Sequence, residues 1–200
     1  MRFGTIGAGV VAQAIARHLV SAGHPVMLSN SRGPSTLAEI VDDLGPLASA
    51  GTVAEAAEAD MVFLTVMWWD IPAALADLSP WDGRILVDAT NQFAQADPIE
   101  VADLGGQTGS EWVADRAPKA RVIKAFNTLH ASYIAANPRH PAGRQVLFYA
   151  GDDASAKVTF LQLADSLGFA PIDVGALRDG GRLMQVGGGP LSALHALKQD

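Results

Sequence analysis

The sequence contains no cysteine, which excludes disulfide bonds, thiolate metal sites and a cysteine nucleophile. It also lacks any apolar run of about 18 residues, the length that would suggest a membrane-spanning helix. Acidic residues outnumber basic ones by 21 to 14, so the net charge is −7 and no nucleic-acid surface is expected. The first residues already belong to a predicted strand, which leaves no room for a signal peptide. We therefore expect a soluble cytoplasmic protein that contacts neither membrane nor nucleic acid.

A glycine-rich turn between a strand and a helix lies close to the N-terminus. Residues 2–6 are mostly apolar and predict a buried strand, and a G-x-G-x-x-A turn follows at residues 7–12. Gly23 ends the next helix before a second strand at residues 25–29. Strand, turn, helix and strand in this order are typical of a dinucleotide-binding unit. We expect one face of the helix to be apolar and buried, with Val10, Ala14, Ile15, Leu19 and Val20 on it.

Each small residue of this turn has a predicted role. Gly7 permits the tight turn, Gly9 lets the backbone approach a pyrophosphate, and Ala12 allows the helix to pack closely on the strand. Free N–H groups at the helix start then hold the anion. The alternative is a tight turn in some other α/β protein. The predicted cofactor contacts in this segment are Gly7, Ala8, Gly9, Val10 and Val11.

The end of the second strand indicates which nicotinamide cofactor is bound. A carboxylate usually stands there to bind the ribose of NAD, but the first carboxylate here is Glu39. Hydroxyl, amide and guanidinium groups occupy the segment instead, and they suit the 2′-phosphate of NADP. The segment can also be a polar turn that caps the helix near Pro34, and the two roles are compatible. The predicted contacts are Asn30, Ser31, Arg32 and Ser35.

Apolar strands alternate with helices along the chain. This alternation predicts an α/β fold, a doubly wound and mainly parallel Rossmann sheet with a small C-terminal α/β extension. We expect a single NADP-binding domain over residues 1–200, with a dinucleotide-binding core at 1–126 and an extension at 127–200 that lines the acceptor site. Ligands bind beyond the strand C-termini in such sheets. Further cofactor contacts are therefore expected at Thr65, Val66, Met67, Trp68, Ala89 and Asn91.

Several local features are also predicted. Thr52 caps a helix over residues 53–59, and Ser110 caps a helix that ends at Arg116. Residues 93–104 have no clear pattern. Residues 153–168 have amphipathic helical spacing. The glycine-rich tail is expected to cover the crevice and to end in a helix over residues 191–198.

Six short motifs together resemble a known family, the NADPH-dependent reductases of the deazaflavin coenzyme F-420, and more closely its bacterial dinucleotide-binding branch. The resemblance spans the whole chain and implies NADP in the crevice, a flat tricyclic acceptor beside the nicotinamide, and homodimers closed by the C-terminal part. The family's Thr-x-x-Trp pattern matches residues 65–68. The motifs are TIGAG (5–9), SNSRGP (29–34), DATN (88–91), KAFNT (124–128), GGRL (180–183) and GGPL (188–191).

Three residues are candidates for the acceptor site. The Trp68 indole can stack on nicotinamide or on a flat acceptor, or it can pack a helix. Asn127 can bond a carboxamide or an acceptor carbonyl, or it can cap a helix. Arg182 can hold an anionic acceptor, or it can brace the tail. His130 can donate a proton or be structural, and no histidines have metal-ligand spacing.

Hydride transfer needs stacked rings, a correct distance and exclusion of water, and no dedicated catalytic side chain. The sequence therefore predicts an oxidoreductase that transfers a hydride between NADPH and a deazaflavin or flavin-type acceptor. One alternative is a reductase of a small carbonyl, imine or quinone, which calls for a proton donor such as Tyr or Lys near the nicotinamide. The only tyrosines, Tyr133 and Tyr149, are not expected on a crevice loop, and Lys124 is expected within a strand. Another is a non-catalytic NADP-sensing module.

Overall fold

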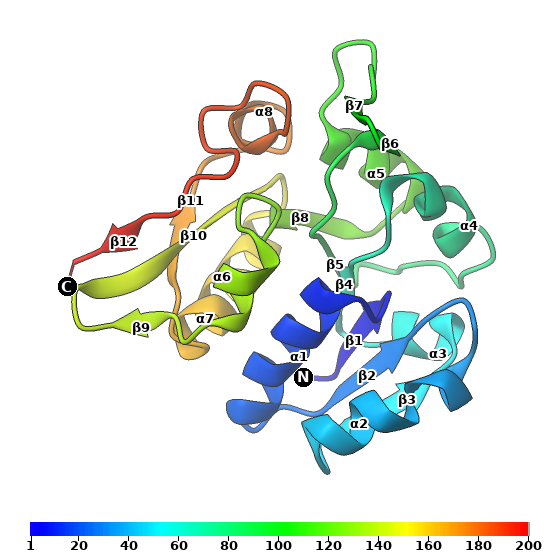
Figure 1. The fold of residues 1–200 in the computed structure, drawn as a ribbon. Coiled ribbons are helices and arrows are strands. Elements are labelled where there is room, and N and C mark those ends of the chain that lie inside the picture. Colours follow the sequence, from blue (N-terminus) through cyan, green and yellow to red (C-terminus); the bar gives the residue numbers. More distant parts are fainter. Residues whose placement is uncertain (200) are drawn as a thin grey trace.

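The computed structural model of the protein describes residues 1–199, and one large sheet forms its centre (Figure 1). The strand order is β11-β10-β8-β5-β4-β1-β2-β3, and the short strands β9 and β12 pair with β10. The strands are β1 (Phe3–Ile6), β2 (Val26–Ser29), β3 (Ala48–Gly51), β4 (Met61–Leu64), β5 (Ile85–Asp88), β8 (Arg121–Ala125), β9 (Arg139–His140), β10 (Gly143–Gly151), β11 (Ala170–Asp173) and β12 (Leu197–Lys198).

The six strands from β3 to β8 in this order are parallel to one another. Strand β10 is antiparallel to β8, and β11 is parallel to β10. The strand order reverses at β1, from which β2 and β3 lie on one side and β4, β5 and β8 on the other. The predicted doubly wound, mainly parallel sheet is confirmed, and the crevice beyond the carboxyl ends of β1 and β4 is its switch point.

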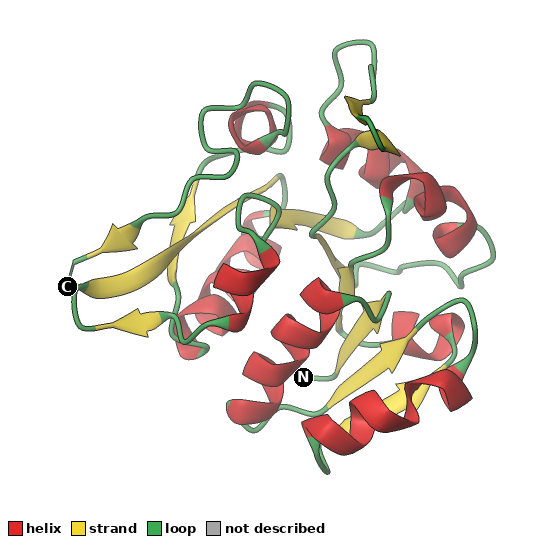
Figure 2. Ribbon diagram, in the orientation of Figure 1, coloured by secondary structure: helices red, strands yellow, loops and turns green. Residues whose placement is uncertain are grey.

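Helices pack on both faces of the sheet (Figure 2). One hydrophobic cluster joins the sheet to α1, α2, α6 and α7, and a second joins its other face to α4 and α5. The helical segments are α1 (Val10–Ser21), η1 (Pro34–Leu37), α2 (Ala38–Leu44), α3 (Val53–Ala57), η2 (Trp68–Asp70), α4 (Ile71–Leu75), α5 (Gly109–Arg116), α6 (Ala131–Ala135), α7 (Ala154–Ser166) and α8 (Asp179–Met184).

Strand β4 illustrates why the central strands are apolar throughout. Met61 and Phe63 belong to the first cluster, whereas Val62 and Leu64 belong to the second. Successive side chains of a strand point to opposite faces, so a strand covered on both sides must be apolar at every position. All four residues are fully buried.

The helix caps agree with the sequence in one case and differ in another. Thr52 is the predicted cap of α3, and it also forms a capping box with Glu55. The cap of α5 is Thr108, with Glu111 as its partner, so the prediction of Ser110 is wrong. Ser110 is already inside the helix, and its hydroxyl donates to the buried Asp88 carboxylate at 2.7 Å.

The sequence carried no clear pattern for residues 93–104, and the prediction for the end of the tail is wrong. The unpatterned stretch contains a two-stranded hairpin of β6 (Phe93–Ala96) and β7 (Ile99–Val101), which projects from the sheet (Figure 1). The predicted helix over residues 191–198 is wrong, because residues 197 and 198 form β12 against Arg144 and Gln145 of β10. Strand β10 extends beyond β8, and the tail satisfies backbone groups that would otherwise have no partner there.

The cap of α7 provides a test of the local structure. Asp153 accepts a hydrogen bond from the Ala156 amide at 2.7 Å, and this bond lowers the pKa of the carboxyl. Asp153→Ala should reduce the free energy of unfolding by about 1 kcal/mol. A lowered carboxyl pKa stabilises the fold above the unfolded-state value and loses this effect as the pH falls, so the difference should shrink below about pH 4.

The measurement is urea unfolding at neutral and at acidic pH. Asp153→Asn, which keeps an acceptor oxygen at the cap, is the matched control and should stay close to the wild type at neutral pH. Equal losses for the alanine and asparagine variants would contradict the assignment of the cap.

Candidate functional site

Gly7 lies where the ends of β1 and β4 approach most closely. Its φ is +108°, a backbone conformation that side chains disfavour. A Cβ atom on Gly7 would lie 2.7 Å from Thr65 Oγ1 and 2.9 Å from the Thr65 carbonyl oxygen. Thr65 Oγ1 also donates to the Ile6 carbonyl at 3.1 Å. Only glycine allows this turn to pack against the end of β4.

The first turn of α1 presents free backbone donors to open space. Gly9 is the N-cap of this 12-residue helix, no side chain caps it, and no acidic residue lies in the first turn. A Cβ atom added to Gly9 would meet nothing within 4 Å. The unsatisfied N–H groups and the positive end of the helix dipole therefore fit an anion such as a pyrophosphate.

The segment after β2 forms a polar turn whose one cation is unpaired. Asn30 accepts from the Arg32 amide at 3.0 Å and donates to Thr36 Oγ1 at 2.9 Å, which fixes the turn. The Arg32 guanidinium is exposed and has no hydrogen bond or ion pair within residues 1–199. An exposed, unpaired guanidinium beside a hydroxyl, that of Ser31, is suited to a phosphate.

A cavity of about 680 Å³ connects this turn to the glycine turn. Nine of the predicted cofactor residues line it, contributed by the ends of β1, β2 and β4. The structure thus brings together three segments that are separated by more than 20 residues along the chain. The nine residues are Gly7, Ala8, Gly9, Asn30, Ser31, Arg32, Thr65, Val66 and Met67.

Six other predicted cofactor residues do not line the cavity. The expectation that Val10 lies on the buried face of α1 is wrong, since its side chain is 71% exposed. Val10 is the first residue of α1, beyond the end of β1, where no strand covers it. Ser35 is exposed in η1, and Val11, Ala89 and Asn91 are half-buried. The six are Val10, Val11, Ser35, Trp68, Ala89 and Asn91.

The sequence analysis missed the wall of the cavity formed by α3, α4 and the segment after α4. The side chains of this wall are mostly small and apolar, which suits a flat nucleotide base such as adenine. The wall also carries two exposed carboxylates, those of Asp70 and Asp77. Alanine side chains do not indicate a ligand site. The sequence therefore offered one indication of this wall, the position of both helices after the end of a strand. The missed residues are Val53, Ala54, Asp70, Ala73, Ala74, Asp77 and Leu78.

Trp68 packs in the protein interior. Its side chain is 7% exposed, and its ring centroid lies 4.5 Å from that of Trp112 in α5. This is the helix-packing role that the sequence left open as the alternative to stacking on a ligand. The neighbouring Trp69 is 44% exposed.

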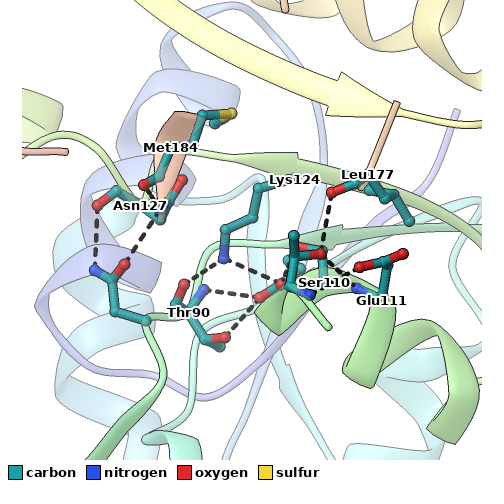
Figure 3. Close-up of polar contacts among 10 residues, drawn as sticks. Thr90, Ser110, Glu111, Lys124, Asn127, Leu177 and Met184 are labelled. Carbon is teal, nitrogen blue, oxygen red and sulfur yellow. Dashed lines mark hydrogen bonds and ion pairs between the residues drawn. The ribbon is translucent and has the colours of Figure 1, made fainter. Parts of the chain in front are cut away.

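A buried ion pair lies at the carboxyl ends of β5 and β8 (Figure 3). Asp88 accepts from Lys124 Nζ at 3.1 Å, from Ser110 Oγ at 2.7 Å, and from the amide and hydroxyl of Thr90 at 2.9 and 2.6 Å. Lys124 also donates to the Thr90 carbonyl. Burial lowers the pKa of Lys124, and the adjacent Asp88 carboxylate opposes this effect. The sequence analysis did not identify this pair.

Asn127, the second acceptor candidate, joins three segments (Figure 3). Its Nδ2 donates to Asn91 Oδ1 at 3.2 Å and to the Met184 carbonyl at 2.9 Å, while Asn91 Nδ2 donates to the Asn127 carbonyl at 3.1 Å. The Oδ1 atom of Asn127 is buried and has no partner within the described chain. The end of β5, the end of β8 and α8 therefore meet at this residue.

Hydrogen bonds of Arg182 and Thr108 hold the segment around α8 at the same edge of the sheet. Its guanidinium is exposed and donates to the Gly106 carbonyl at 2.7 Å, and Thr108 Oγ1 donates to the Leu177 carbonyl at 3.0 Å. Arg182 thus braces the tail, the alternative to an anion contact. His130 is likewise structural, because it is the exposed N-cap of α6 and accepts from the Ser132 amide.

Comparison with known proteins finds a family model that matches the part of the chain forming the cavity. Residues 2–92, a little under half of the chain, match the family model described as NADP oxidoreductase coenzyme F420-dependent, and this match contains the whole cavity lining. The similarity to NADP oxidoreductases is consistent with the Rossmann sheet and the unpaired Arg32.

Two solved structures resemble this protein over most of its length. A hypothetical protein from Sinorhizobium meliloti is 38% identical, with a TM-score of 0.94, covering 100% of this chain and 96% of that one. A protein from Arthrobacter sp. FB24, provisionally assigned as an F420-dependent NADP-reductase, is 27% identical, with a TM-score of 0.79 and coverage of 90% and 89%.

A longer curated relative shares the same part. Metalloreductase STEAP3 of Rattus norvegicus is 32% identical over 177 residues, which are 88% of this chain and 34% of the relative. The chain spans about a third of the length of the curated relatives it matches. No helix within residues 1–199 is long and apolar enough to cross a bilayer.

Gly9 provides the sharpest test of the site. Gly9→Val should abolish NADPH binding, because the branched side chain would occupy the space over the α1 amides. The fold should be kept, since Gly9 has a φ of −74° and an added Cβ meets no atom within 4 Å. The measurements are NADPH titration and circular dichroism.

The control is Gly23→Ala, a change at the other end of α1 where a Cβ also meets nothing within 4 Å. It should bind NADPH normally, with some loss of stability from the positive φ. Normal NADPH affinity in a folded Gly9→Val protein would mean that the turn serves only the fold.

Proposed function

We propose that this protein is an NADP oxidoreductase that transfers a hydride between NADPH and a deazaflavin or flavin-type acceptor. The observation that carries the proposal is the cavity that runs from the free amides at Gly9 to the unpaired guanidinium of Arg32. These two groups suit the two anionic parts of NADP, its pyrophosphate and its 2′-phosphate.

Each part of the cavity has a role in holding NADPH. The α1 amides bind the pyrophosphate, and Ser31 and Arg32 bind the 2′-phosphate. The apolar wall of Val53, Ala54 and Leu78 lies beside the adenine. Residues 65–67 would then lie beside the nicotinamide half. When bound, NADPH supplies the hydride, and the protein contributes orientation and exclusion of water.

The similarities favour a flavin-type acceptor. The family description names coenzyme F420, a deazaflavin, and the longer relatives are named metalloreductases. NADPH gives up two electrons as a hydride, whereas a metal ion accepts single electrons. A flavin and a deazaflavin both accept a hydride on a flat tricyclic ring, but only the flavin also releases single electrons. A hydride-accepting ring of this type is therefore compatible with both descriptions, with a flavin required where a metal ion is the final acceptor.

The alternative, a reductase of a small carbonyl, imine or quinone, needs a proton donor near the nicotinamide. Tyr149 is 2% exposed within β10, and Tyr133 stacks on His195 at 4.0 Å between ring centroids. Lys124 is engaged by Asp88 and Thr90. None of these three residues lines the cavity, so the flavin-type acceptor is the better fit.

Arg32→Ala tests the cofactor assignment. The variant should bind NADPH more weakly by roughly 1.5–3 kcal/mol, the value of a charge-assisted hydrogen bond. Its affinity for NADH should be almost unchanged, because NADH has no 2′-phosphate. Both cofactors are titrated against wild type. Arg17→Ala, which also removes an exposed arginine from the same protein, is the control and should change neither affinity. Equal losses for NADPH and NADH would refute the role of Arg32.

The acceptor is tested by the loss of nicotinamide absorbance when NADPH is mixed with the protein and a panel of acceptors. Deazaflavin or flavins should oxidise NADPH fastest, and quinones, carbonyls and imines slowly. The Gly9→Val protein is the control for oxidation without a bound cofactor. Preference for a carbonyl or imine would favour the alternative reductase, and tight binding without any turnover would favour an NADP-sensing module.

A further inference from the structure

The ion pair of Asp88 and Lys124 lies outside the cavity lining, at the last residue of β5 and the penultimate residue of β8. Asp88 is fully buried and Lys124 is 4% exposed, and the two residues face each other in the β5–β8 register. Neither side chain lines the cavity. The pair therefore acts on a ligand only through the residues that it holds.

Those residues are the segment that follows β5. Asp88 binds both the amide and the hydroxyl of Thr90, and Lys124 binds the Thr90 carbonyl, so every polar group of Thr90 is fixed by the pair (Figure 3). Asn91 comes next and exchanges hydrogen bonds with Asn127. The pair thus determines where Asn91 and Asn127 lie at the carboxyl edge of the sheet.

Stability alone does not account for such a pair. Removing two charges from water is costly, and a buried ion pair can often be replaced by apolar residues without loss of stability. Strands β4 and β5 otherwise bury only apolar side chains at this depth, namely Met61–Leu64 and Ile85–Val87. Apolar residues would fit the core here, but they could not bind all the polar groups of Thr90.

We propose that Asp88 and Lys124 are positioning residues for hydride transfer, which hold Thr90 and Asn91 so that the nicotinamide half of NADPH is ordered at the edge of β5 and β8. This inference rests on the proposed function. It divides the site into two parts. The cavity between Gly9 and Arg32 provides affinity for the adenosine half, and the buried pair provides order in the reacting half.

The experiment compares two ligands in the full-length protein. One is 2′,5′-adenosine diphosphate, which has only the adenosine half, and the other is NADPH, whose nicotinamide fluorescence reports order around the ring. Lys124→Met should bind 2′,5′-adenosine diphosphate within about twofold of the wild type. Bound NADPH should lose the emission change seen with the wild type. Turnover with the best acceptor should fall roughly a hundredfold, the effect of a misplaced reacting group.

The matched control is Arg84→Met. Arg84 directly precedes β5, at the end of that strand opposite to Asp88, and it forms an ion pair with Glu58. Arg84→Met therefore also removes a cation and an ion pair. Its ligand affinities, NADPH emission and turnover should match the wild type.

A second variant, Asp88→Leu with Lys124→Met, guards against unfolding caused by a single buried charge. It should also keep the affinity for 2′,5′-adenosine diphosphate and lose the nicotinamide emission change. Wild-type emission and turnover in this double variant would overturn the inference. Failure of the double variant to fold, or an equal loss of affinity for 2′,5′-adenosine diphosphate and NADPH, would also overturn it. Failure of the proposed function is distinguishable, because the wild type itself would then not bind or not oxidise NADPH.

Discussion

The close contact between Gly7 and Thr65 is the constraint on which the arrangement of the cofactor cavity depends. Thr65 donates from its amide to the Ile6 carbonyl at 2.9 Å, and Gly7 donates from its amide to the Ser29 carbonyl at 3.1 Å. Thr5 Oγ1 also donates to the Gly7 carbonyl at 2.7 Å. The ends of β1, β2 and β4 are therefore joined at one turn. The amides of α1, the polar turn after β2 and the cavity wall after β4 keep their relative positions because of this junction.

Where the sequence carried a local physical signal, it predicted the fold well. The continuous apolar run of β4 indicated a strand covered on both faces, and Thr52 indicated a helix start. The tail could not be predicted in this way. Residues 191–198 have helical spacing, but the free edge of β10 takes up the last residues as β12. Long-range backbone pairing overrode a weak local pattern there.

The candidate site likewise has parts that the sequence predicted and parts that it did not. The turns after β1 and β2 could be assigned because short motifs with special backbone or charge requirements mark them. The alanine-rich wall from α4 could not, since its small side chains carry no chemical signal until the fold brings them into the same cavity as Arg32. Trp68 shows the opposite case. An aromatic residue after a strand suggested ligand stacking, but Trp112, 44 residues later, provides its packing partner.

The cavity lining comes from residues 6–78, whereas the segments that meet at Asn127 come from the ends of β5 and β8 and from α8. The cavity and the proposed acceptor contacts therefore lie in different stretches of the chain. Under the proposed function, a substitution in α8 or after β8 alters the acceptor end of the site and leaves the residues between Gly9 and Arg32 unchanged. The acceptor can then differ while NADPH remains the source of reducing equivalents.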